Sequence, residues 1–356
     1  MIFYVQIGFC SEFFCSSGYD KRIMTIQAEN NPIPESPNKP GLTDLPQWGL
    51  ILVSGTDAES FLQNQLTNSI QGLSPTTPCN IAEGKQGVRL VGYCNAKGRL
   101  LASAWVASFQ MPESSEQCYG LLLSKDIAAS FAKRLSMYVL RSKVTVQDVS
   151  DQWKVSGYFS DPDKISQLPT NQFMYGMRLP DVLSNGKTHS RVLLVQRIES
   201  HTGTFDENDF LEWNALEVLS AIPRIVLATQ EQFVPQMINF ESVAGIDFKK
   251  GCYPGQEIVA RSQYRGAIKR RLQLAHLDGP LDPLSCAPGV ELFTSDEPTQ
   301  PAGMVVLSAR SPKNANYVYF QIECKLEALE HGQIHLGSSD GPVLKIDSLP
   351  YSLIEI

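Results

Sequence analysis

The segment "KKGCYPGQEIVAR", Lys249 to Arg261, places one cysteine between a glycine and a tyrosine, directly after two lysines. Pro254 and Gly255 open the run "QEIVARSQY", which predicts a helix that Gly266 can close. The first N–H groups of a helix and nearby lysines both attract negative charge, so the pattern favours the reactive thiolate form of Cys252. A small buried cysteine in a glycine-rich turn is the structural alternative, and the residues leave both open.

Basic residues are concentrated from this segment onward, whereas the chain as a whole has a net charge of -7. Only Glu257 opposes them between Lys249 and Arg271. The basic residues are Lys249, Lys250, Arg261, Arg265, Lys269, Arg270 and Arg271. Such a run is usually a solvated face with ion pairs. Its functional interpretation is a site for an anionic ligand, such as a carboxylate tail or phosphates. A nucleic-acid groove is less favoured because aromatic residues are sparse around the run.

The composition is that of a globular protein outside the membrane. The chain has 356 residues, enough for roughly two or three domains, with 43% hydrophobic and 19% charged residues. Its 8 cysteines are scattered and form no C-x-x-C pair, which indicates reduced thiols in the cytoplasm rather than a disulfide framework. The histidines show no metal-binding spacing, so no metal site is expected.

Residues 1–44 are predicted to be a flexible N-terminal extension. The first residues are apolar but lack a basic start and a cleavage site, which argues against a signal peptide, and they are too short and interrupted to span a bilayer. A proline-rich polar stretch follows, so we expect order to begin near Leu45.

Hydrophobic periodicity divides the remainder into three parts. Residues 45–150 contain strand patterns at 49–55, 99–109, 119–124 and 143–149, with a helix over 126–140, and this predicts an α/β lobe. Residues 151–268 form a second such lobe, with a strand at 191–197 and a helix that Asp206 or Asn208 caps and Pro223 ends. Residues 269–356 contain short alternating runs separated by turn residues, which are typical of a small β-barrel.

The helix of the second lobe carries an apolar stripe, and Trp213 falls roughly opposite to it. The stripe consists of Leu211, Ala215, Val218, Leu219 and Ile222. Trp213 is therefore either covered by a second layer or lines a cleft.

Several stretches together resemble the YgfZ family of folate-binding proteins. The segment 249–261 is similar to that family's K-G-C-Y-x-G-Q-E signature, and "GYCNAKGRLLA" (92–102) is similar to its D-x-K-G-R segment, with Asn95 where the family often has Asp. The stretches 48–70 and 233–248 and the terminal "LPYSL" also match, so the resemblance extends from Leu45 to the C-terminus.

The resemblance implies an α+β fold with two ferredoxin-like lobes and a C-terminal β-barrel, in the ring arrangement of the glycine cleavage T-protein. It implies binding of tetrahydrofolate or another reduced folate, and support of iron–sulfur enzymes or their assembly proteins, including tRNA thiolation. Direct contact with tRNA is left open. The alternative is a tetrahydrofolate-dependent aminomethyl transferase, which "KGRLLASAW" (97–105) disfavours because it lacks an acid where the T-protein has one. A scaffold with a vestigial pocket is a third interpretation.

The resemblance also assigns roles to individual residues. Trp48 and Trp213 match the two tryptophans that line the family's folate site, and aromatic faces suit a flat ring system. Lys250 and Arg261 are the residues expected to hold the glutamate tail. Cys252 is the candidate for redox or sulfur-transfer chemistry.

Overall fold

The computed structural model describes residues 40–112, 116–168, 174–184, 186–200, 205–266 and 268–354. Most of the extension predicted for residues 1–44 therefore lies outside the described residues. Its last part is described, and the boundary at Leu45 was too late. Gly41–Asp44 forms strand β1, which pairs with a strand more than 100 residues further along the chain, and this long-range pairing gives no local sequence signal.

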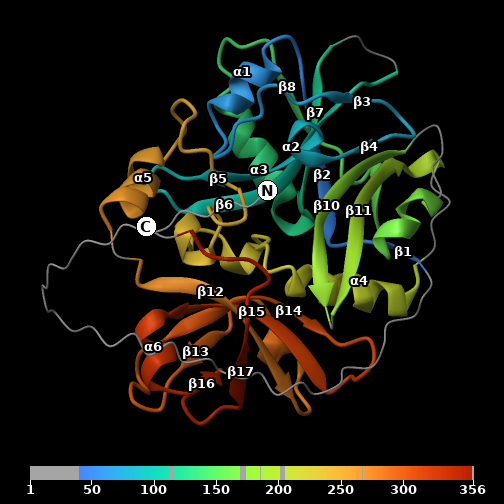
Figure 1. Ribbon diagram of the computed structural model, residues 1–356. Helices are drawn as coiled ribbons and strands as arrows, with labels where there is room; N and C mark the ends of the chain where they lie inside the picture. Colours follow the sequence, from blue (N-terminus) through green and yellow to red (C-terminus); the bar gives the residue numbers. More distant parts are fainter. Residues whose placement is uncertain are drawn as a thin grey trace, which may run out of the picture. The chain divides into compact units, whose positions relative to one another are not determined.

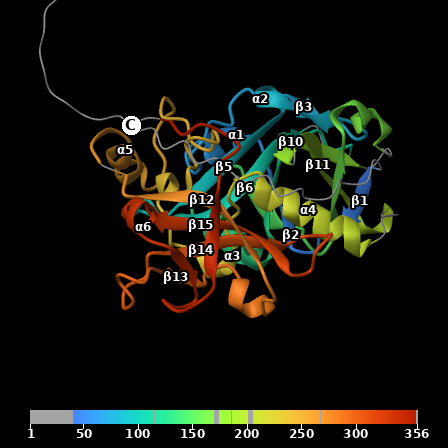
Figure 2. The same ribbon diagram turned by 60° about the horizontal axis from the view of Figure 1, so that its bottom comes forward.

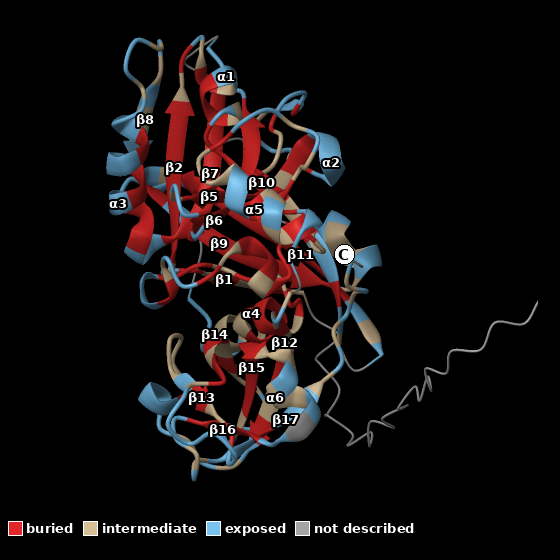
Figure 3. Ribbon diagram, turned by 90° about the vertical axis from the view of Figure 1, so that its left-hand side faces the viewer, coloured by how far each residue is buried: buried red, intermediate tan, exposed pale blue. Residues whose placement is uncertain are grey.

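One sheet is built from residues of the predicted first lobe. Its strands run in the order β3-β6-β7-β2-β8, and β5 also pairs with β6, antiparallel and outside this order. The strands are β2 (Trp48–Ser54), β3 (Pro75–Thr76), β5 (Val88–Cys94), β6 (Leu100–Phe109), β7 (Cys118–Ser124) and β8 (Thr145–Asp148). β6 and β7 are buried along their whole length, as the red ribbons of Figure 3 show. This burial explains why both strands read as continuous apolar runs.

The second sheet has the order β1-β9-β11-β10-β4. Its strands are β1, β4 (Ile81–Ala82), β9 (Trp153–Ser160), β10 (Tyr175–Ser184) and β11 (Lys187–Arg197). Two of them, β1 and β4, come from the chain before residue 150. The second sheet is thus completed at both edges by strands from the first part of the sequence.

The C-terminal part forms a closed β-barrel with its own apolar interior, which includes Leu292, Phe320 and Ile322. Its strands, in barrel order, are β12 (Arg270–Asp278), β15 (Tyr317–Lys325), β14 (Gly303–Arg310), β13 (Glu291–Phe293), β16 (Ile334–Leu336) and β17 (Val343–Asp347). Two sheet-bearing lobes with helices and a terminal barrel confirm the predicted α+β fold class.

Short helices connect and cover the sheets. The α-helices are α1 (Ala58–Gln63), α2 (Gly84–Gly87), α3 (Lys125–Ser136), α4 (Glu207–Leu219), α5 (Gln256–Tyr264) and α6 (Leu326–His331). The 3₁₀ turns span Pro162–Gln167, Ile198–Ser200, Leu227–Thr229, Pro235–Ile238 and Pro283–Cys286. No helix in the described part of the chain is long and apolar enough to cross a membrane.

Helix α4 lies between the second sheet and the barrel (Figures 1 and 2). It begins at Asp206, whose side chain accepts a hydrogen bond from the N–H of Asp209, so Asp206 is the cap among the two candidates. At its other end, the buried Gln321 of β15 donates hydrogen bonds to the carbonyls of Glu217 and Val218. One continuous apolar core joins both sheets, α4 and one side of the barrel.

Trp213 is fully buried on α4, so the apolar stripe predicted for this helix was only partly correct. Ala215 and Val218 are buried as expected, but the tryptophan opposite them is buried too because the helix is covered on more than one side. A side-chain atom on Gly157 of β9 would lie 2.4 Å from the indole of Trp213, so only glycine allows this packing.

Candidate functional site

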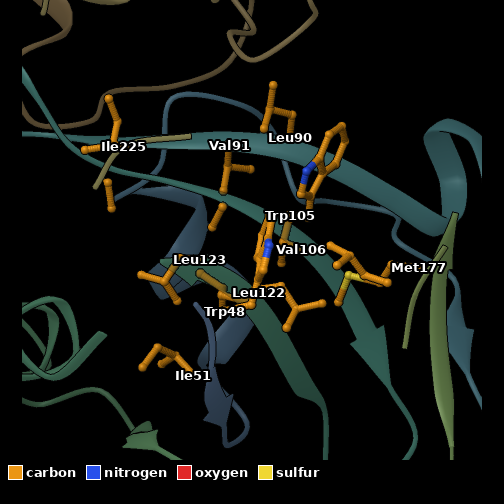
Figure 4. Packing of buried hydrophobic residues seen from close by; sticks show 14 of the residues in the cluster. Trp48, Ile51, Leu90, Val91, Trp105, Val106, Leu122, Leu123, Met177 and Ile225 are labelled. Atoms are coloured by element: carbon orange, nitrogen blue, oxygen red, sulfur yellow. The ribbon is translucent and has the colours of Figure 1, made fainter. Parts of the chain in front are cut away.

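A narrow slot lies where the two sheets and α4 meet. Its volume is about 20 Å³, which is room for about one water molecule. Trp48 of β2 and Trp105 of β6 line it from the first sheet, and Trp105 packs beside Leu90 (Figure 4). Trp213 of α4 and Arg191 of β11 line it from the opposite side. The structure therefore brings together Trp48 and Trp213, which are 165 positions apart in the sequence.

The faces of both tryptophans are occupied by arginines. The guanidinium carbon of Arg224 lies 4.9 Å from the ring centroid of Trp48, and that of Arg191 lies 5.9 Å from the ring centroid of Trp213. Arg224 is also held by two hydrogen bonds to Glu217, from Nε at 2.6 Å and from Nη2 at 3.3 Å. Each of these two indoles therefore has an arginine over one of its faces.

A much larger pocket of about 780 Å³ adjoins the slot, and the two share Leu90, Trp105 and Leu179 as lining residues. This volume is in the range of pockets that take drug-sized ligands. Val88, Pro180, Val243, Ile246 and Phe248 provide further apolar lining. Trp105 lies at the junction, and its side chain lines both cavities.

Charged residues surround this pocket. Arg89 is held by the carbonyls of Lys85, Ser69 and Gln71, and so it shapes the wall. Arg178 pairs with Glu83 and with Asp181. By contrast, the side chains of Lys85 and Lys249 are exposed at the pocket and have no ion-pair partner among the described residues. These two lysines are the cations that an anionic ligand could reach.

Lys250 has a different role from the one expected for it. It does not line the pocket, and its ammonium group donates hydrogen bonds to the carbonyls of Gln63, the last residue of α1, and of Leu66. Its Nζ also lies 5.3 Å from the ring centroid of Tyr253. Burial lowers the pKa of Lys250 to about 8, although the nearby Asp247 acts in the opposite direction. Lys250 therefore anchors the signature loop, and Lys249 is the lysine that faces the pocket.

Cys252 is exposed in the loop between Lys250 and α5, and it lines neither cavity. Most other described thiols are buried: burial raises the pKa of Cys94 and Cys324 to about 12 and that of Cys118 to about 11. Exposure of Cys252 excludes the alternative of a buried cysteine that fills a turn. Arg261 is also exposed and lines neither cavity.

The two motifs that carried the resemblance are in contact. Gly255 caps α5 with φ 79°, and a side-chain atom there would lie 2.4 Å from the carbonyl oxygen of Asn95. Asn95 closes the β5–β6 turn, because its Oδ1 accepts hydrogen bonds from the N–H groups of Lys97 and Arg99 at 2.9 and 3.0 Å. An aspartate could accept the same bonds, so asparagine at this position preserves the turn.

The end of the basic run is structural. Arg270 pairs with Glu323, and the buried Arg271 pairs with Glu241 and also donates to the carbonyl of Gln236. Ion pairing, rather than ligand binding, is thus the correct interpretation for these two arginines. Among the described residues, no three His, Cys, Asp or Glu side chains gather as a metal site.

Sequence reasoning missed Trp105, Arg191, Arg224 and Lys85 as lining residues, and it included Lys249 in the basic run without choosing it as a site residue. Trp105 stands in the strand "RLLASAWVASF", where an apolar residue is expected on either face. Only Lys249 stood in a recognised motif, next to the lysine that was chosen. The others had no local signal, because the cavities they line are formed by distant segments.

The fold is that of the aminomethyltransferase T-protein class. The glycine cleavage system aminomethyltransferase T from Bartonella henselae superposes with a TM-score of 0.55 over 88% of this chain and 86% of that chain, at 14% identity. No family model matches the sequence.

Sequence relatives define the family more closely. A tRNA-modifying protein YgfZ from Photobacterium profundum is 30% identical over 250 residues, which cover 66% of this chain and 70% of that protein. A tRNA-modifying protein YgfZ from Photorhabdus laumondii is 26% identical over 331 residues, 88% of this chain and 93% of that protein. The chain belongs to the YgfZ family.

Proposed function

We propose that this protein binds tetrahydrofolate or another reduced folate in the 780 Å³ pocket and supports iron–sulfur enzymes or their assembly proteins, including one that thiolates tRNA. The observation that carries the proposal is the pocket itself. It combines drug-sized volume, a mostly apolar wall with Trp105 at its inner end, and two unpaired lysines among the described side chains. A reduced folate has matching chemistry, since a flat ring system is joined to a carboxylate tail.

In this proposal the ring system would pack near Trp105, and the tail carboxylates would interact with Lys85 and Lys249. The family relatives are named for tRNA modification, and the structural relative is an aminomethyltransferase of the glycine cleavage system. The names of the family relatives support the tRNA-modification part of the proposal. The proposal includes a cytoplasmic location, as the scattered cysteines suggested.

Aminomethyl transfer is the second candidate. The stretch 97–105 supplies no acid, but Asp181 and Asp247 line the pocket, so carboxylates are present near the proposed ligand. Asp181 is engaged by Arg178 and by the hydroxyl of Ser190 at 2.9 Å, which reduces its freedom to act on a reacting amine. We therefore rank this activity second. Turnover with tetrahydrofolate and the glycine-cleavage partner proteins, comparable with a true T-protein, would reverse the ranking.

The direct test is a titration of the purified full chain with tetrahydrofolate. Val243→Trp would fill part of the pocket with an indole, and we expect it to weaken binding roughly tenfold or more, equivalent to about 1.4 kcal/mol. Val343→Trp, on the partly exposed β17, is the matched control and should bind as the wild type does. Binding that is absent in the wild type, or equal in both variants, would contradict folate binding in this pocket.

The cellular part of the proposal is tested separately. A strain lacking the protein should show reduced tRNA thiolation and reduced iron–sulfur enzyme activity, and the wild-type gene should restore both. Restoration by Val243→Trp to the full level would show that the cellular role does not require the pocket.

A further inference from the structure

The turn that joins α3 to β8 exposes three large apolar side chains. Met137 is 70% exposed, Tyr138 44% and Leu140 87%. The backbone of Leu140 has a φ of 48°, in the left-handed region where glycine or asparagine is the usual residue. Leucine at this position therefore serves neither the interior of the fold nor the geometry of the turn. Exposed apolar side chains that gather in this way are typical of a protein–protein contact.

The same segment is strongly basic, although the chain as a whole is acidic. Residues 133–143 include four basic residues and no acidic one, whereas the net charge of the chain is -7. The basic residues are Lys133, Arg134, Arg141 and Lys143, and all four are exposed. None of them has an ion-pair partner among the described residues. This end of the first lobe thus offers positive charge that no carboxylate in the described part of the chain pairs with.

Strand β8 is the last strand at one end of the first sheet, and in the part of the chain that the structure describes it pairs only with β2. Figure 3 shows it at the margin of that sheet, with α3 beside it. The N–H of Val149 bonds to the carbonyl of Leu50, and hydrogen-bonded pairs alternate along an antiparallel ladder. Val146, opposite Val53, is therefore at a non-hydrogen-bonded position. Its N–H and C=O point away from β2, toward the open edge.

A strand added at this edge would extend the face of the sheet that α3 covers. A side-chain atom on Gly49 of β2 would lie 3.2 Å from the Cβ of Ala128 on α3, which places this face of β2 against the helix. Val53 shares that face with Gly49, because the two are four positions apart on one strand. Val146 lies opposite Val53 and so on the same face. Every second side chain of the added strand would also lie on this face, beside the helix that ends in the exposed apolar residues.

We propose that the open edge of β8 and the end of α3 form a docking surface for an extended segment of a partner protein. The segment pairs with β8 as an additional strand, places large apolar side chains against Met137 and Leu140, and carries acidic residues that pair with the neighbouring cations. Backbone hydrogen bonds supply affinity, whereas the apolar contacts and the charges select the segment. None of these residues lines the proposed folate pocket, so the proposal does not rest on the proposed function.

Charge decides among the possible occupants of this edge. A second copy of the chain, paired through its own β8, would bring two sets of these four cations into one interface, and like charges in contact disfavour that pairing. An RNA strand would be attracted by the cations, but Tyr138 is the only aromatic residue in 133–143 on which a base could stack. RNA also makes no use of an open strand edge or of Leu140. An acidic, extended protein segment uses all three features.

The direct test uses an array of short synthetic peptides in which Glu alternates with Val, Leu or Phe, and a matching array in which Lys replaces Glu. Binding of the purified full chain is measured in low and in high salt. We expect saturable binding to acidic peptides, roughly tenfold or weaker binding to their basic counterparts, and loss of affinity as salt rises. Amide hydrogen exchange should show protection of Val146 when an acidic peptide is bound. No saturable binding to any acidic peptide, or no protection of Val146, would overturn the proposal.

Three variants test the three features of the surface. Val146→Pro removes the outward N–H without removing a bond to β2, and an edge position of this kind tolerates proline, so this variant should abolish peptide binding. Leu140→Ser should weaken binding severalfold, and Arg141→Glu should weaken it roughly tenfold. The last two substitutions are at exposed positions, so they keep the test decisive if Val146→Pro does not fold.

The matched controls lie on the C-terminal barrel. Leu284→Ser replaces a leucine that is 79% exposed in a 3₁₀ turn, and Lys345→Glu reverses the charge of an exposed lysine on β17. Both variants should bind the acidic peptides as the wild type does. Tetrahydrofolate binding is measured in parallel and should be the same in every variant, which distinguishes loss of docking from loss of the fold.

The outcomes separate this proposal from its alternatives. Equal peptide affinity in Leu140→Ser and Leu284→Ser, or in Arg141→Glu and Lys345→Glu, would overturn the docking surface. A wild-type dimer that Leu140→Ser dissociates would assign the edge to a second copy, and tighter binding of a short single-stranded RNA than of any acidic peptide would assign it to RNA. Either result would contradict the proposal. Peptide binding in a protein that does not bind tetrahydrofolate would support the docking surface and contradict the proposed function.

Discussion

The signature segment and the central slot both contain buried basic side chains, but they satisfy them differently. In the basic run that begins with the signature segment, Lys250 is held by two backbone carbonyls, and Arg271 at the end of the run is paired with Glu241. In the slot, the Nε of Arg191 has no partner among the described residues. The comparison teaches that the motif most visible in the sequence is largely a structural joint that presents one exposed thiol. Buried N–H donors without a partner among the described residues lie instead in the slot, where segments distant in the sequence meet.

The buried ion pair between Arg271 and Glu241 should therefore contribute strongly to the stability of the fold. We expect Arg271→Met to lower the free energy of unfolding by about 3–5 kcal/mol, because it leaves the carboxylate of Glu241 buried without its partner. Urea denaturation measures the change. Arg265→Met, at an exposed position nearby, is the control and should stay within about 0.5 kcal/mol of the wild type. If Arg271→Met lowered the free energy of unfolding by less than about 1 kcal/mol, the pair would not be the structural anchor that distinguishes this region from the slot.

The large pocket is tested through Trp105, one of its aromatic lining residues. Trp105→Ala should weaken tetrahydrofolate binding by on the order of 1 kcal/mol, about fivefold, since it removes the indole at the inner end of the pocket. Trp105→Phe should retain most of the affinity. Trp48 and Trp213 are better replaced by Phe than by Ala, because loss of a buried tryptophan costs about 3–5 kcal/mol in stability. Unchanged affinity in Trp105→Ala would show that this residue does not contact the ligand.

The anchoring role of Lys250 has a pH signature. Its pKa is about 8 in the folded protein and about 10.4 in an unfolded chain, so between these values the unfolded state binds more protons. Stability should therefore rise with pH across this window, relative to Lys250→Met. Because the ammonium group is partly exposed, we expect a total effect on the order of 1 kcal/mol or less. Denaturation at pH 7, 9 and 10.5 measures it, and parallel curves for the two proteins would contradict the lowered pKa.

Cys252 should have the smallest effect on stability and a large effect on function. Cys252→Ala should change the free energy of unfolding by less than about 0.5 kcal/mol, because the side chain is exposed, and should still bind folate. It should nevertheless fail to restore iron–sulfur enzyme activity in a deletion strain. Cys79→Ala removes the other exposed described thiol and should restore activity fully. Alkylation should also be faster at Cys252 than at Cys79, and equal rates would argue against a special reactivity of Cys252.

Much of the fold could be predicted because its signals are local. The mostly apolar strands β6 and β7, the Asp206 cap of α4 and the alternating runs of the barrel each follow from a few neighbouring residues. The signature and its companion segments then indicated the family. The strands β1 and β4 were not foreseen, because they are short and their partners lie far along the chain.

The sequence by itself determined the classes of element, the family and the position of the candidate thiol Cys252 in a glycine-rich loop, whereas the structure showed that this thiol is exposed. Only the tertiary structure decided that Lys249 faces the pocket while Lys250 is bound by carbonyls after α1. It also decided that Trp105 and Arg191 line cavities. The physical reason is that the environment of a side chain depends on which distant backbone packs against it, and periodicity within one segment carries no information about that partner.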